Sequence, residues 1–224
     1  MKIDQDIVAK LRETRKFDNW RSKPEEDEHS LEMHLPYIYK MLSQTFKSSD
    51  DFPLLVPILV GATNGNTEKE YGRIFAPYLA DPTTVFVISS DFCHWGERFQ
   101  YTKYLPDHPQ VPTVTVKPRD LTRLDKTPTD PPIHESIGHL DKLSMAAIST
   151  GVHDEFLKNL RETENTICGR HPIGVVMAAI EVLREEGKIP EHKGNFKFLR
   201  YERSNDVMTV KDSSVSYASG VALL

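Results

Sequence analysis

The sequence predicts an α/β fold, in which one domain is built on a central mixed, largely parallel sheet flanked by helices. Two apolar segments, 53–61 and 83–88, are rich in β-branched residues and enclose an amphipathic helix predicted over 67–80. A strand–helix–strand order gives a right-handed parallel crossover. Segment 83–88 is apolar at nearly every position, which suits a strand covered on both faces. These observations place the first α/β unit at 53–88.

The chain before this unit is predicted to be helical. Asp4 can cap a short helix on which Ile7 and Leu11 lie one turn apart. A second helix has an acidic start at residue 25 and an apolar face, and Pro36 should kink or restart it. Because no strand precedes the first helix, we expect a sheet that lacks its first strands.

The chain after this unit alternates between a long loop, helices and strands. Residues 101–133 are rich in proline and read as an inserted, extended loop, for which a passive insertion is favoured over a lid or a docking segment. Apolar periodicity then predicts helices over 134–149, 152–161 and 173–183, and alternation predicts strands over 196–201 and 213–223.

Composition narrows the class of protein. A chain of 224 residues with 38% hydrophobic residues can bury one sizeable core, so we expect a single domain over 1–224. The net charge of -5 argues against nucleic acid or an anionic membrane as the main partner. No signal peptide or membrane-spanning run is visible. We therefore expect a soluble cytoplasmic protein, and the nucleus stays open as a second compartment.

The first chemically capable cluster follows the predicted strand 83–88. Asp91, Cys93 and His94 leave its carboxyl end, where ligands bind in open α/β sheets. A carboxylate, a thiol and an imidazole can bind a metal or move protons. A capping Asp, a core Cys and a hydrogen-bonded His beneath Trp95 would give the same sequence. Local sequence alone leaves both readings open.

The second cluster surrounds Cys168, just before the predicted helix 173–183. The amino end of a helix attracts anions and favours a thiolate, so Cys168 could ligate a metal or act as a nucleophile. A structural cysteine beside a turn glycine is an equal alternative. With only two cysteines, 75 positions apart, the chain has neither a CxxC zinc pattern nor a disulfide framework.

The histidines give weaker signals. His29 and Glu32 are three residues apart and can share a helix face, which suits a binding pair and equally a surface pair. His153, His108 and His192 are expected at the surface.

Three stretches together resemble the Memo family, which is similar in fold to class III extradiol dioxygenases of the LigB type. They are 27–36 (DEHSLEMHLP), 89–96 (SSDFCHWG) and 165–174 (NTICGRHPIG). The resemblance covers nearly the whole chain except 101–133, which looks like an insertion. It implies a single α/β domain with a pocket for iron or copper. Cys168 matches the cysteine ligand of that pocket, and His94, with Asp91 beside it, matches an acid/base residue.

The sequence also departs from the family pattern. Family members carry an Ala-Pro-His-Ala-Gly and a Gly-Pro-Ser-His-His stretch that supply ligand histidines, and this chain has neither. The resemblance therefore implies an N-terminally incomplete Memo-like domain whose metal binding is impaired.

Two functions follow as hypotheses. The first is a Memo-like intracellular regulatory protein with an iron or copper redox pocket, for which enzymatic activity as an oxidoreductase stays open. The alternative is a non-catalytic signalling module that binds phosphorylated or acidic peptides and acts in motility or cytoskeletal regulation. Arg170 and the helix amino terminus near it would then receive the phosphate or carboxylate, and His171 is a further candidate binding residue. Both hypotheses require His94 and Cys168 to converge at one end of the sheet, and neither fixes the oligomeric state.

Overall fold

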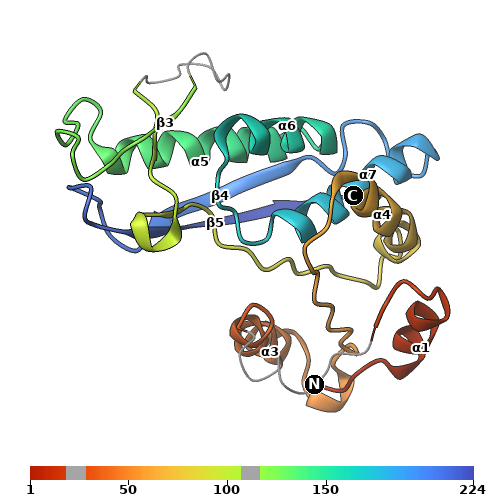
Figure 1. Cartoon of the computed structure of the whole chain (residues 1–224). Helices are drawn as coiled ribbons and strands as arrows, with labels where there is room; N and C mark the ends of the chain where they lie inside the picture. The colour runs from red at the N-terminus through yellow and green to blue at the C-terminus, as the bar shows by residue number, and fades with distance from the viewer. Residues whose placement is uncertain (19–28, 107–116) are drawn as a thin grey trace. The chain divides into compact units, whose positions relative to one another are not determined.

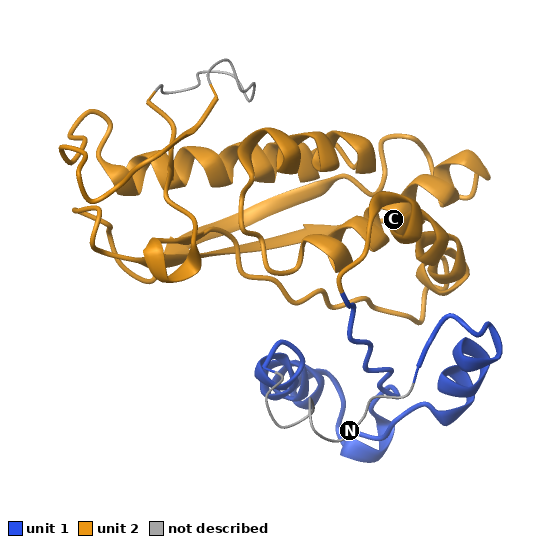
Figure 2. Ribbon diagram, viewed as in Figure 1, with its two compact units in different colours: residues 1–61 blue, residues 62–224 orange. Residues whose placement is uncertain are grey.

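The computed structural model describes residues 1–18, 29–106 and 117–224, which form two compact units (Figure 2). Unit 1 comprises residues 1–61 and unit 2 comprises residues 62–224. Each unit is described by itself, and the single domain over 1–224 stays a prediction. Within the described ranges, no helix combines the length and apolarity that a bilayer crossing needs.

Unit 1 contains helices α1 (Gln5–Glu13) and α3 (Leu35–Thr45) and two short 3₁₀ turns, Glu32–His34 and Ser49–Asp51. Asp4 caps α1 as predicted, because its Oδ1 accepts a hydrogen bond from the Ile7 backbone N–H at 2.9 Å. Pro36 lies in the first turn of α3, where its missing N–H costs nothing. The predicted second helix therefore restarts at Pro36, and its residues 25–28 lie outside the described residues.

Unit 2 contains the remaining elements (Figure 1). Its helices are α4 (Gly65–Leu79), α5 (Ile133–Ser149), α6 (His153–Thr163) and α7 (Arg170–Glu185). Its strands are β1 (His94–Trp95), β2 (Lys103–Tyr104), β3 (Arg119–Asp120), β4 (Phe196–Arg203) and β5 (Ser214–Ala222), and a 3₁₀ turn covers Glu97–Phe99. The predicted helices and the last two strands are confirmed to within a few residues at each end. The coarse α/β prediction therefore holds.

The sheets correct the prediction of a largely parallel arrangement. The described strands form a sheet of order β1-β5-β4 and a separate β2-β3 pair, and every strand pairing is antiparallel. The one parallel contact among the described residues is an isolated bridge between Ile3 and Leu55. Strands β4 and β5 are consecutive and joined by residues 204–213, a connection too short for a parallel crossover.

The two segments expected as buried strands, 53–61 and 83–88, are not strands in the described structure. Within 83–88, Val85 is 83% exposed and Val87 is 54% exposed, whereas the Phe86 ring packs edge-on against Phe75 of α4. A β-prone sequence becomes a strand only where a neighbouring strand offers hydrogen bonds, and none of the described strands pairs with this segment. The βαβ unit predicted from these segments is therefore wrong for the described structure.

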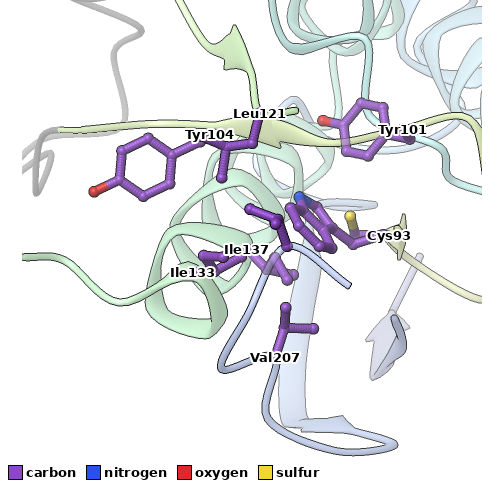
Figure 3. Close-up of a cluster of buried hydrophobic side chains, with 9 residues drawn as sticks. Cys93, Tyr101, Tyr104, Leu121, Ile133, Ile137 and Val207 are labelled. Carbon is purple, nitrogen blue, oxygen red and sulfur yellow. The ribbon is translucent and has the colours of Figure 1, made fainter. Parts of the chain in front are cut away.

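The core of unit 2 lies between the helices and the β4-β5 pair. Helices α5 and α6 cover one face of the pair (Figure 1), and Ile148, Phe156 and Phe92 form a buried cluster against which Phe196 and Phe198 pack. A second cluster contains Cys93 and Trp95 (Figure 3). The described ends of the proline-rich stretch contribute to that second cluster, through buried residues Tyr101, Tyr104 and Leu121. These ends are therefore part of the core.

Helices α4 and α7 pack closely because α4 carries Gly72 where the two helices cross. A Cβ on Gly72 would lie 2.7 Å from the Ala178 Cβ and 2.8 Å from the Ala179 backbone nitrogen. This close approach brings the first turn of α4 near the start of α7, where the polar residues described below meet.

Candidate functional site

The segments that carry Asp91 and Cys168 are bonded to each other through the backbone. The Cys168 N–H donates to the Asp91 carbonyl at 3.1 Å, and the Gly169 N–H donates to Ser90 Oγ at 3.0 Å. A side chain at 169 would clash with the Ser89 carbonyl, so only glycine permits this contact. The predicted convergence of the two sequence clusters is therefore present in unit 2.

Hydrogen bonds fix both the backbone and the ring of His94. Its backbone N–H donates to Thr166 Oγ1 at 2.8 Å, and that hydroxyl donates to the His94 carbonyl at 3.0 Å. The ring Nδ1 lies 3.0 Å from the Phe92 carbonyl and 3.1 Å from the Thr166 carbonyl. Because both partners accept only, Nδ1 carries the proton. The lone pair of neutral His94 is then on Nε2.

Asp91 faces that nitrogen. Its Oδ2 lies 3.7 Å from His94 Nε2, with the Asp91 side chain 46% exposed and the His94 side chain 22% exposed. Cys168 is also exposed, whereas Cys93 is buried in the core. Burial raises the pKa of the Cys93 thiol well above its ordinary value, so it stays protonated. The exposed cysteine of the pair is the one suited to chemistry.

The buried carboxylate of Asp141 hydrogen-bonds to residues beside His94 and Thr166. Asp141 of α5 accepts hydrogen bonds from the Cys93 N–H at 3.2 Å, from Asn165 Nδ2 at 2.9 Å and from Tyr201 Oη at 2.7 Å. Burial raises the pKa of Asp141, and these hydrogen bonds partly offset the rise. Two of the donors belong to residues adjacent to His94 and Thr166, so Asp141 fixes both sides of the cluster.

A second buried carboxylate lies at the start of α7. Glu68 of α4 is 1% exposed, and its two oxygens lie 2.7 Å from His153 Nε2 and 2.6 Å from His171 Nδ1. Burial acts to raise the pKa of Glu68, but the hydrogen bonds from the two imidazoles outweigh it and lower the pKa. Glu68 is therefore an ionised carboxylate held between two histidines. The expectation that His153 lies at the surface is wrong, because its side chain is fully buried.

The other predicted binding residues have different surroundings. Arg170 is exposed at the first position of α7, and its Nη1 donates to the Ile167 carbonyl at 3.3 Å. Few backbone N–H groups at the start of α7 are free to bind an anion. The Gly169 N–H donates to Ser90 Oγ, the Arg170 N–H donates to the Ile167 carbonyl, and Pro172 has no N–H. The geometry gives little support to an anion site built on this helix start.

His29 and Glu32 form an exposed pair in unit 1. His29 Nδ1 lies 3.8 Å from Glu32 Oε2, and their side chains are 75% and 74% exposed. Both side chains are open to solvent, as the surface-pair alternative predicts. Their role in binding stays a prediction.

Sequence reasoning did not identify Glu68, Asp141 or Thr166 as site residues. Glu68 carried a usable signal, because it lies seven residues before Phe75 on the buried stripe of α4. A charged residue on such a stripe needs a partner. The partners of Asp141 come from three distant segments, so no local pattern marked it.

The donor types around Cys168 suit iron or copper, which accept thiolate and imidazole ligands. The number of donors among the described residues, however, is too small to hold a metal ion. Among the described residues, no three His, Cys, Asp or Glu side chains are gathered closely enough to hold a metal ion. The described residues alone therefore do not enclose a metal.

Comparison with known proteins gives a consistent result. A sequence model of the family described as Memo-like protein matches residues 1–221. The chain is 41% identical over 224 residues to Protein MEMO1 of Danio rerio and 40% identical over 220 residues to that of Homo sapiens. These alignments cover 100% and 98% of the chain, but 65% and 64% of the relatives. A Protein memo-1 homolog of Caenorhabditis elegans is 42% identical over 219 residues, which cover 98% of the chain and 54% of that relative.

Proposed function

Because the chain belongs to the Memo-like family, we propose that it is an intracellular regulatory protein that works through a redox pocket at Cys168. In this proposal Cys168 gives a thiolate ligand to iron or copper, and the pair of Asp91 and His94 handles protons beside it. In this proposal the remaining ligands come from residues other than those of this cluster, because the described residues alone do not bring three donors together.

The observation that carries the proposal is the joint placement of Asp91, His94 and Cys168. Cys168 bonds directly to the Asp91 backbone, and His94 presents Nε2 while two carbonyls hold its Nδ1–H. An imidazole fixed in this way can accept a proton at Nε2, and the Asp91 carboxylate at 3.7 Å stabilises the imidazolium that forms. A thiolate ligand and a proton acceptor carried by neighbouring, backbone-bonded segments suit coupled electron and proton transfer.

The test is the metal content of the purified chain after anaerobic loading with ferrous iron or with cuprous copper. We expect bound metal in the wild type and its loss in Cys168→Ser, which keeps the shape of the side chain but removes the thiolate. The matched control is His192→Ala, because His192 is exposed and not part of the cluster. A wild type that takes up no metal, or a Cys168→Ser variant that keeps it, would contradict the proposal.

The alternative of a phosphopeptide-binding module has one favourable observation. Arg170 is exposed, and its contact with the Ile167 carbonyl steadies a guanidinium that could pair with a phosphate. Titration of a phosphotyrosine peptide against wild type and Arg170→Ala tests it. Equal affinity of the two proteins would remove this role from Arg170.

A further inference from the structure

The hydrogen bonds around Glu68 determine which nitrogen of His171 carries the proton. Glu68 Oε1 lies 2.6 Å from His171 Nδ1, and an ionised carboxylate only accepts. Nδ1 therefore donates. Thr63 Oγ1 also lies 3.1 Å from this nitrogen and donates weakly to Glu68 at 3.3 Å. In the neutral imidazole, the lone pair is then on Nε2.

The opposite nitrogen of His171 is accessible. The His171 side chain is 17% exposed, and no described residue bonds its Nε2. His153, by contrast, is fully buried, and its Nε2–H donates a hydrogen bond to the second oxygen of Glu68 at 2.7 Å. The two histidines therefore differ in kind: His153 anchors the carboxylate, and His171 presents a basic nitrogen to the outside.

The surroundings are shaped to keep this carboxylate in place. A Cβ on Gly174 would clash with Glu68 Oε2, so glycine leaves the room that the carboxylate occupies on α7. Burying an ionised carboxylate is expensive unless its oxygens are bonded, and here both oxygens are. Three segments, from α4, α6 and α7, converge to fix one ring.

We propose that Glu68 and His171 form a carboxylate–imidazole proton-transfer site, in which Glu68 holds Nδ1–H and Nε2 accepts a proton from a bound water or hydroxyl compound. The proton moves to Nε2, the Nδ1–H stays on the ring, and the Glu68 carboxylate stabilises the imidazolium until the proton returns to the product. Glu68 is the positioning residue. The inference needs no metal at Cys168 and is independent of the proposed redox pocket.

The first test uses the unmodified chain. Nitrogen-15 NMR of the imidazoles reports which ring nitrogen is protonated in neutral His171, which His171→Ala identifies by loss of its signals. We expect the Nδ1–H form. An Nε2–H form would overturn the proposal, and because this measurement needs no change at Glu68 it does not depend on that variant's stability.

The second test measures the reactivity of Nε2. Diethyl pyrocarbonate acylates the unprotonated nitrogen of neutral imidazoles, and mass spectrometry gives the rate at His171, with exposed His192 of the same chain as reference. In Glu68→Gln the negative charge is lost, so the limiting rate at His171, read on the high-pH plateau where the ring is neutral in both proteins, should fall about tenfold, the lower end of the effect of removing a carboxylate behind a functional imidazole. Thr63→Val keeps the carboxylate and should leave the rate nearly unchanged.

A purely structural role for Glu68 gives the opposite result. If the carboxylate only ties helices together, its loss loosens the packing and exposes His171, so the rate stays the same or rises. Circular dichroism on each variant checks that folding is retained. An unchanged or faster reaction at His171 in folded Glu68→Gln would contradict the proposal, and metal content at Cys168 would not be affected by either outcome.

Discussion

At the residue scale, two separate polar clusters are each held by a buried carboxylate, Asp141 or Glu68, whose partners no single stretch of sequence reveals. Asp91, His94 and Cys168 were predictable because each belongs to a dense polar cluster beside an apolar segment. Glu68 and Asp141 each bond side chains tens of positions away, for example Glu68 to His171. Such contacts exist only after the fold has formed, so a local pattern can mark the residue but not its partners.

Removing Asp141 should be costly. In Asp141→Ala the buried donors of Cys93 and Asn165 lose their acceptor, and each buried donor without a partner costs about 1–3 kcal/mol. We expect the free energy of unfolding to fall by about 3–5 kcal/mol, measured by urea denaturation. Asp141→Asn keeps one acceptor oxygen and should lose clearly less. Equal stability of Asp141→Ala and wild type would show that this network does not hold the fold.

The stability contributed by Glu68 should depend on pH in a defined direction. Its pKa is lowered in the folded protein from an ordinary value of 4.5, so the folded state binds this proton less readily than the unfolded state. The contribution is therefore fully present above pH 4.5 and is lost as the pH falls below it toward the folded pKa. We expect the stability difference between wild type and Glu68→Gln to shrink between pH 7 and about pH 3.5. A constant difference by urea denaturation would contradict this.

At the element scale, the helices followed from periodicity and the parallel strands did not. Asp4 and the apolar stripe of α7 identified helices, whose backbone bonds are internal to each segment. Segment 83–88 has the composition of a buried strand, yet Val85 and Val87 face solvent. A strand depends on a neighbour for its hydrogen bonds, and the composition of one segment cannot guarantee that neighbour.

We expect the exposed Val85 and Val87 to make segment 83–88 prone to self-association. An extended β-branched segment with exposed apolar side chains tends to pair with another chain. Val85→Lys should weaken this association about tenfold, which corresponds to about 1.5 kcal/mol for one valine side chain, measured by light scattering across a concentration series. The control is Leu124→Lys, at a turn residue that is 97% exposed and outside any extended apolar run. Equal effects of the two substitutions would assign the association to general hydrophobicity.

The crossing of α4 and α7 should not tolerate a side chain at position 72. A Cβ there would lie 2.7 Å from the Ala178 Cβ, so Gly72→Ala must push the helices apart. Overpacking of this kind costs about 1–3 kcal/mol, partly offset by the better helix propensity of alanine, about 1 kcal/mol. We expect a net loss in thermal unfolding experiments. A variant more stable than wild type would show that the helices separate without cost.

At the scale of the whole molecule, membership of the Memo-like family agrees with the contact between the His94 and Cys168 segments in unit 2. The chain spans 65% and 64% of the length of the vertebrate relatives in Danio rerio and Homo sapiens. Within that span, the segments around His94 and Cys168 meet as the sequence predicted, although the sheet that contains His94 is antiparallel. The meeting of the two segments was therefore predictable even where the sheet was not, because it depends on short loop contacts such as that of Thr166 with His94.

In the proposed function, the Cys168 thiolate is a metal ligand beside the Asp91–His94 pair. X-ray absorption spectroscopy of the iron- or copper-loaded chain tests it directly, because a sulfur ligand gives a distinct coordination shell. We expect sulfur in the shell of the wild type, whereas Cys168→Ser should retain too little metal to give a coordination spectrum. A wild-type spectrum without sulfur, or a sulfur contribution that survives in Cys168→Ser, would contradict this role of Cys168.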